Sequence, residues 1–126
     1  MSAVVVATAF GGPEVLAVVE QDAGPCGPGQ VRIAVRAAGV NPIDWKRYGG
    51  DMGRDEGDLP MRLGYEAAGT VTEAGEGAEG PAGAIAAGDE VIAYSISGAY
   101  ADEVVVAAAA VVPKPAGGRS RRSRWR

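Results

Sequence analysis

The stretch VRIAVRAAGVNPIDWKRYGG, residues 31–50, decides the fold because it joins an alternating strand to the start of a short helix. Its first half predicts a strand over residues 31–39 whose inner face carries Val31, Ile33, Val35 and Ala37. In its second half Asn41 predicts a helix N-cap. Pro42 suits the first helical position, where no amide hydrogen is needed. Gly49 or Gly50 can then end the helix in a left-handed conformation.

The pair Asn41 and Asp44 has two interpretations. Asp44 stands three residues after the cap and resembles the reciprocal partner of a capping box, although Glu or Gln is more usual there. Helix capping alone therefore explains both residue types at this spacing. By the same default, Trp45 and Tyr48 are partly buried packing residues and Lys46 is solvated. The spacing by itself leaves a functional role of these residues open.

Outward from this stretch the chain is predicted to be mainly β, because 20 glycines and 8 prolines favour short strands and turns over long helices. The regions 51–60 and 76–89 are expected to be loops. Strands are expected over residues 3–10, 15–20, 65–75, 90–95 and 98–110, the first two as a hairpin and the last broken near Ala107. With a single short helix, the pattern indicates one domain built as a partly open β-barrel.

Composition excludes several classes of function. The chain has no histidine and one cysteine, Cys26, so it lacks the commonest general base and an internal disulfide. Its longest apolar run, residues 104–112, is far shorter than the ~20 residues that span a bilayer. No basic leader precedes the first apolar run, so no signal peptide is predicted. We expect a cytoplasmic protein without a membrane partner.

Charge divides the chain into an acidic body and a basic tail. All 16 acidic residues lie before Gly117, whereas the tail GGRSRRSRWR contains five arginines and no acid. We expect a domain over residues 1–117 and a disordered tail over residues 118–126. A minor alternative is nucleic-acid binding through the tail arginines and Trp125, by phosphate contacts and stacking. The acidic body makes nucleic acid an unlikely partner.

The segment GEGAEG, residues 75–80, matches the spacing of a dinucleotide-binding glycine motif. Such a motif functions only between a strand and a helix, whose amides meet the pyrophosphate. Pro81, Gly83 and Gly88 make a poor helix start, and Glu76 and Glu79 would repel phosphate. The segment is therefore predicted to be an ordinary turn.

Six short stretches in order resemble a known family: FGGPEVL, GPGQVRIAVRAAGVNPIDW, LPMRLGYEAAGTVTEAGEGA, AAGDEVIAY, GAYADEVVV and VVPKP. Together, over about residues 3–117, they resemble the zinc-independent, quinone oxidoreductase-like branch of the medium-chain dehydrogenase/reductase superfamily. The resemblance implies a GroES-like catalytic domain, a partly open β-barrel with one or two short helices.

The resemblance also bears on metal binding. Zinc-dependent alcohol dehydrogenases carry Cys where Asn41 stands and His where Tyr65 stands, and Cys26 is too isolated to represent their structural zinc lobe. Neither Asn nor Tyr replaces a thiolate or an imidazole as a zinc ligand, so we expect no metal. Without a metal to polarise a plain carbonyl, hydride is better delivered to an acceptor that is already electron-poor.

The function implied by the resemblance is NADPH-dependent reduction of quinones or α,β-unsaturated carbonyls by hydride transfer. The resemblance places Asn41 and Asp44 on the nicotinamide side of an interdomain cleft. It suggests Lys46 or Tyr48 as donors to the developing oxyanion. Glu66 is expected to hold other site residues in place without contacting the substrate itself. The substrate pocket is expected to include Trp45, Tyr65 and Tyr94.

The chain departs from the family near Gly117. Family members continue for roughly 200 residues into a Rossmann domain and return to finish the barrel. Here an Arg/Ser-rich tail follows, which we interpret as a shifted reading frame or a truncation. We expect this chain alone to lack tight NADPH binding and turnover, with the missing Rossmann domain as its partner. An exposed edge would favour self-association. The alternative is a non-enzymatic barrel that recruits a partner through its exposed face.

Overall fold

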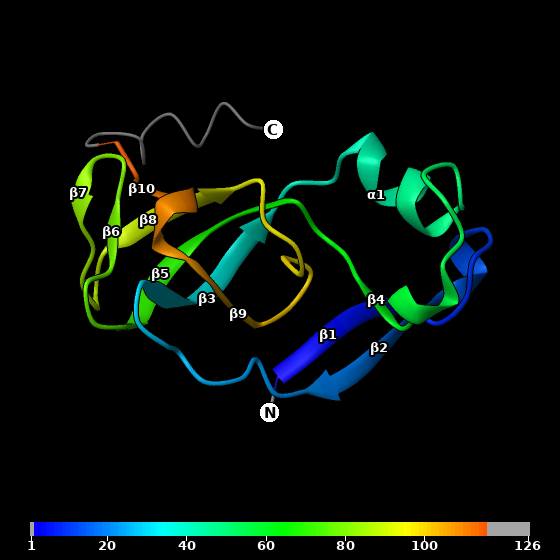
Figure 1. Ribbon diagram of the computed structural model, residues 1–126, viewed down its shortest axis with the longest axis horizontal. Coiled ribbons are helices and arrows are strands. Elements are labelled where there is room, and N and C mark those ends of the chain that lie inside the picture. Colours follow the sequence, from blue (N-terminus) through cyan, green and yellow to red (C-terminus); the bar gives the residue numbers. More distant parts are fainter. Residues whose placement is uncertain (1, 116–126) are drawn as a thin grey trace.

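The computed structural model describes residues 2–115, in which five strands form one antiparallel sheet (Figure 1). The order of the strands across this sheet is β10-β8-β5-β3-β9. The members are β3 (Gln30–Ala38), β5 (Glu66–Ala74), β8 (Glu90–Tyr94), β9 (Glu103–Ala107) and β10 (Val111–Pro113). The mainly β architecture predicted from the sequence is confirmed, with the strand after residue 30 next to the centre of the sheet.

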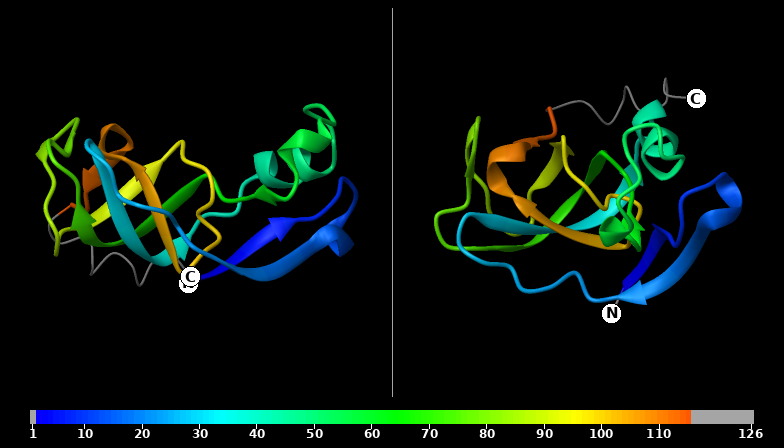
Figure 2. Two further views of the ribbon diagram at one scale, coloured as in Figure 1. Left: turned by 60° about the horizontal axis from the view of Figure 1, so that its bottom comes forward. Right: turned by 45° about the vertical axis from the view of Figure 1, so that its right-hand side comes forward.

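A smaller three-stranded sheet lies beyond one end of the larger one (Figure 2). It consists of β2 (Leu16–Gln21), β1 (Ser2–Ala7) and β4 (Met61–Arg62), in that order. β1 and β2 pair antiparallel, so the predicted hairpin is confirmed, and a 3₁₀ turn over Pro13–Val15 connects them. The one α-helix in residues 2–115, α1 (Pro42–Tyr48), lies on the same side of the molecule as this sheet (Figure 1).

The core is built on the alternating side chains of β3 as far as Val35, where the alternation ends. Val31 and Ile33 are fully buried and pack with Val71, Val91, Val104 and Val111. The ladder between β3 and β5 shifts between Val35 and Ala37, and Ala37 is exposed. The prediction that Ala37 shares the inner face is therefore wrong, because a β-bulge adds a residue and reverses the alternation.

Several predicted boundaries also differ from the structure, and the first strand, expected over residues 3–10, ends at Ala7. The region 76–89 contains a two-stranded ribbon, β6 (Glu79–Gly80) and β7 (Gly83–Ala84), where only a loop was expected. The last long strand begins at Glu103 and not at residue 98, and its expected break at Ala107 is confirmed by a 3₁₀ turn over Ala108–Ala110. A further 3₁₀ turn over Glu56–Asp58 lies within the loop 51–60. These elements are too short to leave a periodic pattern. The glycine-rich segment 75–80 forms a turn that leads into β6, and no helix follows it, so it lacks the context of a dinucleotide-binding motif.

Two contacts fix β3 between its neighbours. Gly69 of β5 faces the carbonyl oxygen of Ala34 so closely that a Cβ there would overlap it, which explains the glycine. On the outer face, Arg32 Nε lies 3.1 Å from a Glu73 carboxylate oxygen of β5, and its Nη1 lies 3.2 Å from Glu103 of β9. One guanidinium therefore bridges three strands.

Candidate functional site

The first turn of α1 is fixed by a buried carboxylate. Asn41 is the N-cap in extended conformation, and its backbone N–H donates to Asp44 Oδ2 at 3.0 Å. Asp44 is only 4% exposed and accepts two further hydrogen bonds, from the Gly64 N–H at 3.2 Å and the Tyr100 hydroxyl at 2.7 Å. The predicted helix cap is confirmed, and Asp44 also ties α1 to two loops distant in sequence.

Tyr100 is a site residue that sequence reasoning missed. Burial raises the pKa of its hydroxyl, and the hydrogen bond to the Asp44 carboxylate raises that pKa further. The phenol therefore keeps its proton at neutral pH and acts as a donor. No local pattern predicts this contact, because Tyr100 lies 56 residues after Asp44 in the chain.

The two residues predicted to face a nicotinamide differ in what they can offer a ligand. Both carboxylate oxygens of Asp44 already accept hydrogen bonds from the protein, so Asp44 positions the turn. Asn41 Nδ2 is buried and has no hydrogen-bond partner within residues 2–115. A free buried donor of this kind needs an acceptor. Asn41 is therefore the one of the two that is equipped to contact a bound group.

Tyr65, Tyr94 and Glu66 come together where β5 meets β8. The rings of Tyr65 and Tyr94 meet edge to face, with centroids 5.3 Å apart. The Tyr65 hydroxyl lies 3.1 Å from Ser95 Oγ, and Tyr94 stands opposite Glu66 in the ladder. Ser95, also missed by sequence reasoning, has a positive φ of 61°. Tyr94 is 59% exposed, so this group presents aromatic surface and hydroxyls to the outside.

Glu66 also touches the segment that carries Asn41. A Cβ on Gly39 would overlap the Glu66 carboxylate, and the Gly39 N–H donates to the Glu66 carbonyl at 3.2 Å. Gly39 thus allows the carboxylate to pack beneath the link between β3 and α1. This placement suits the supporting role predicted for Glu66.

The remaining predicted site residues lie further along α1. Trp45 is 51% exposed, and the Lys46 Nζ lies 5.7 Å from the centre of its ring. Tyr48 is buried against Ala7 and Leu63, so it packs in the core, as its default interpretation states. Trp45 and Tyr48 border a cavity of about 440 Å³ that Tyr65 and Tyr94 do not line. The structure therefore divides the predicted pocket between two places.

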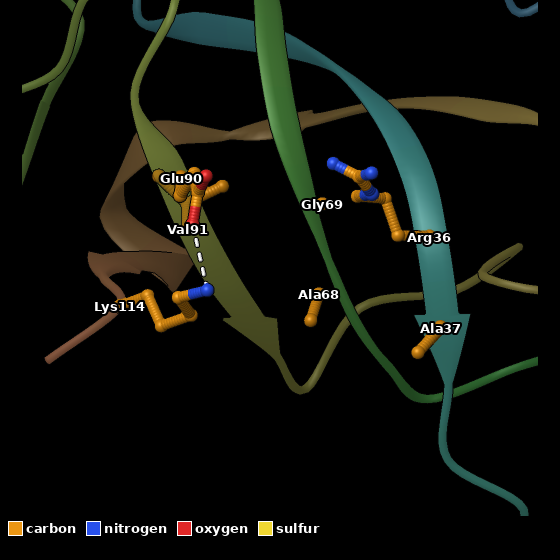
Figure 3. A pocket seen from close by; sticks show the side chains of 7 residues that line it. All are labelled: Arg36, Ala37, Ala68, Gly69, Glu90, Val91 and Lys114. Carbon is orange, nitrogen blue, oxygen red and sulfur yellow. Dashed lines mark ion pairs between the residues drawn. The ribbon is translucent and has the colours of Figure 1, made fainter. Parts of the chain in front are cut away.

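A larger cavity of about 530 Å³ lies on the outer face of the five-stranded sheet (Figure 3). None of the predicted site residues lines it. It is bordered by Arg36 and Ala37 of β3, Ala68 and Gly69 of β5, Glu90 and Val91 of β8, and Lys114. The Lys114 Nζ lies 2.6 Å from a Glu90 carboxylate oxygen. Because side chains two residues apart share a face, Ala68 lies on the same face of the sheet as Glu66, although neither Glu66 nor Tyr94 lines the cavity.

The remaining predictions concern metal binding, Cys26, membrane spanning and the C-terminal tail. Within residues 2–115 no three His, Cys, Asp or Glu side chains gather closely enough to hold a metal ion. Cys26 is a free thiol whose Sγ donates to the Gln30 carbonyl at 3.2 Å. No helix in this range is both long and apolar enough to cross a bilayer. The predicted tail, residues 118–126, lies outside the described residues.

The sequence and the fold of this chain both match known proteins. The model of the alcohol dehydrogenase GroES-like domain matches residues 27–116. Quinone oxidoreductase 1 of Escherichia coli is 36% identical over 106 residues, which cover 82% of this chain and 31% of that protein. A component of the pikromycin polyketide synthase of Streptomyces venezuelae is 44% identical over 93 residues, covering 74% of this chain and 2% of that protein.

Solved structures give the same result. The crystal structure of Escherichia coli quinone oxidoreductase complexed with NADPH matches with a TM-score of 0.81 and 31% identity, over 90% of this chain and 33% of that one. The chain belongs to the alcohol dehydrogenase GroES-like domain family, and within it to the quinone oxidoreductase-like branch. It spans about a third of the length of these quinone oxidoreductases. The predicted fold class is thereby confirmed.

Proposed function

We propose that this chain supplies the substrate-facing half of an NADPH-dependent, zinc-independent oxidoreductase that reduces quinones or α,β-unsaturated carbonyls. The observation that carries the proposal is the buried Asn41 Nδ2, a hydrogen-bond donor without a partner within residues 2–115. It lies on a helix turn that Asp44 fixes, in a chain similar to quinone oxidoreductases. Because the chain spans about a third of these relatives, the complete active site requires residues beyond those described.

The residues present fit a nicotinamide. The carboxamide oxygen of a nicotinamide could accept a hydrogen bond from Asn41 Nδ2. Without such an acceptor this buried donor has no partner among the described residues. Asp44 and Tyr100 hold the turn that presents Asn41. When bound, NADPH supplies the hydride. The chain itself contributes orientation and a fixed polar wall.

The other side of the proposed pocket is formed by Tyr65, Tyr94 and Ser95. A hydroxyl aimed at the oxygen of a quinone or an enone stabilises the negative charge that develops there during reduction. Tyr65 and Ser95 hold each other at 3.1 Å, so their hydroxyls are oriented before a substrate binds. Lys46, predicted from the sequence as an oxyanion donor, remains a candidate from the exposed side of α1. The buried packing of Tyr48 favours Lys46 over Tyr48 for that role.

A chimaera tests the proposal. Residues 1–115 replace the matching part of Escherichia coli quinone oxidoreductase, and NADPH oxidation is followed with a quinone acceptor. We expect quinone-dependent turnover that added Zn²⁺ does not increase. Tyr65→Phe should lower kcat by about tenfold or more, because loss of a single oxyanion donor is costly. Glu79→Gln, on the distant ribbon, is the matched control.

Two results would contradict the proposal. A folded chimaera that binds NADPH but reduces neither a quinone nor an enone would remove the proposed reaction. Full activity in an Asn41→Ala chimaera, with an unchanged KM for NADPH, would remove the role given to Asn41.

A further inference from the structure

β2 forms one margin of the three-stranded sheet, and its outer side has no neighbouring strand within residues 2–115 (Figure 2). The strand runs over Leu16–Gln21 and pairs with β1 without a register shift. It contains no proline, lysine or arginine, and Glu20 is its only charged residue. Natural edge strands are usually short, bulged, charged or covered, because a free edge pairs readily with another strand. β2 has little of this protection.

The pairing with β1 shows which backbone groups of β2 face outward. The Thr8 N–H donates to the Val15 carbonyl at 2.9 Å, so these two residues form a hydrogen-bonded pair. Every second residue counted from Val15 therefore points its N–H and C=O toward β1. The residues between them, whose N–H and C=O point away from β1, are Leu16, Val18 and Glu20. The Leu16 N–H already donates within the 3₁₀ turn. No partner within residues 2–115 is described for the N–H groups of Val18 and Glu20.

Two other strand edges are covered by neighbouring groups. At β4, the Arg62 carbonyl accepts hydrogen bonds from Arg47 Nη1 at 3.4 Å and from Ser97 Oγ at 3.5 Å. At β10, a Cβ on Gly80 would overlap the Val111 carbonyl oxygen, so β6 packs closely against that edge. These contacts leave little room for a further strand at either edge.

β9 is the other long strand with a side that has no described partner within residues 2–115. The Val35 N–H donates to the Asp102 carbonyl at 2.9 Å, so the outward groups of β9 follow by the same alternation. They belong to Glu103, Val105 and Ala107. Val105 is half-buried, whereas Val18 is 71% exposed. Of the two free edges, β2 therefore presents the more accessible apolar side chain.

β2 is complementary to itself when two copies pair antiparallel about Val18. In that register Val18 lies opposite Val18 of the second copy, and Leu16 lies opposite Glu20. All the outward residues then fall in hydrogen-bonded pairs, and the two exposed valines meet on one face of the sheet. A register centred on Glu20 would instead place two carboxylates directly opposite each other, which is destabilising.

We propose that β2 pairs with β2 of a second copy of this chain, antiparallel and centred on Val18. The pairing joins the three-stranded sheets of the two copies across a two-fold axis. The Val18 N–H donates to the Val18 carbonyl of the second copy, and the Glu20 N–H donates to the Leu16 carbonyl. One strand pair is a small interface, so the dimer is weak, with a Kd on the order of 0.1 mM. The pairing does not depend on the proposed hydride transfer.

The full 126-residue chain tests the pairing directly. Sedimentation equilibrium measures self-association up to about ten times the expected Kd, and NMR measures amide hydrogen exchange at both ends of that range. The amides of Ala17 and Val19, which face β1, should exchange slowly throughout. The amides of Val18 and Glu20 should become protected only as the dimer forms. A chain that stays monomeric, or a dimer in which the Val18 amide exchanges as in the monomer, would overturn the proposal.

Proline variants test the backbone donor. Val18→Pro removes an outward N–H without breaking a hydrogen bond to β1, so it should weaken dimerisation by about tenfold or more. Val105→Pro is the matched control, because it removes an outward N–H from β9 in the same way and should leave dimerisation unchanged. Circular dichroism checks that both variants are folded. Equal losses in the two variants, or a loss in Val105→Pro alone, would contradict the assignment to β2.

Charged variants test the register, even if Val18→Pro fails to fold. Val18→Lys and Val18→Glu should each dimerise less than wild type, because each places like charges opposite one another at the two-fold axis. A mixture of the two should form heterodimers, since only this register brings residue 18 opposite residue 18. The same pair of substitutions at Val40, which is 81% exposed but lies outside β2, should show no such preference. A mixture of the Val18 variants without preferred heterodimers would overturn the proposed register.

Discussion

The five-stranded sheet and the junction between α1 and β4 are held together by different forces. The sheet packs aliphatic side chains, of which Val31 and Ile33 are fully buried. The junction has a small apolar cluster of Ala7, Tyr48, Met61 and Leu63, and beside it lies the buried Asp44 with its three hydrogen bonds. Apolar burial is non-directional, whereas hydrogen bonds fix angles. Asn41, which is proposed to contact the cofactor, is therefore positioned by the directional hydrogen bonds of the junction, whereas the sheet is held by apolar burial.

The largest effect is expected in the sheet. Ile33→Ala should lower the free energy of unfolding by about 4 kcal/mol, because it removes buried methyl groups and leaves a cavity. Urea unfolding followed by circular dichroism measures the change. Val18→Ala is the control, since Val18 is 71% exposed, and its effect should stay within about 0.5 kcal/mol. Similar losses in both variants would mean that burial does not distinguish the two positions.

A smaller but more local effect is expected at the junction. Asp44→Asn should cost about 2 kcal/mol, because an amide turns one acceptor into a donor and leaves a buried N–H or O–H unpaired. The Gly64 amide should then exchange hydrogen faster, while the Ile33 amide exchanges as before at matched stability. Asp51→Asn, on an exposed residue, is the control. An unchanged Gly64 exchange rate would remove Asp44 as the link between α1 and the loop.

The smallest effect depends on pH. Tyr100→Phe should cost about 1.5 kcal/mol near neutral pH, through loss of one hydrogen bond to a carboxylate. The folded state raises the pKa of Tyr100 and so holds this proton more tightly than the unfolded chain does. The stabilisation is therefore present below pH ~10 and is lost as pH rises above that value.

Urea midpoints between pH 8 and pH 11 measure this loss. The difference between wild type and Tyr100→Phe should shrink as pH rises, whereas Tyr94→Phe, with an exposed ring, should show no such trend. A constant difference across the range would mean that the Asp44 contact does not hold the proton of Tyr100.

Sequence alone predicts the features that depend on neighbouring residues. The alternation of β3 and the Asn41–Asp44 spacing both specify local geometry, and the structure contains the strand and the capped helix that they predict. Ala37 was misplaced because a bulge depends on the partner strand, which periodicity does not describe. The roles of Tyr100 and Ser95 depend on contacts between distant segments, so no local pattern predicts them.

The three-strand bridge of Arg32 has a consequence for how β3 finds its partners. A slip of β3 by one residue would carry Arg32 to the inner face and separate it from Glu73 and Glu103 at once. Val31 and Ile33 would move to solvent in the same step. A one-residue slip thus destabilises the sheet in two ways. It buries the Arg32 charge without a partner, and it exposes the aliphatic side chains of Val31 and Ile33 to water. Pairings of β3 that are shifted by one residue are therefore disfavoured when it meets β5 and β9.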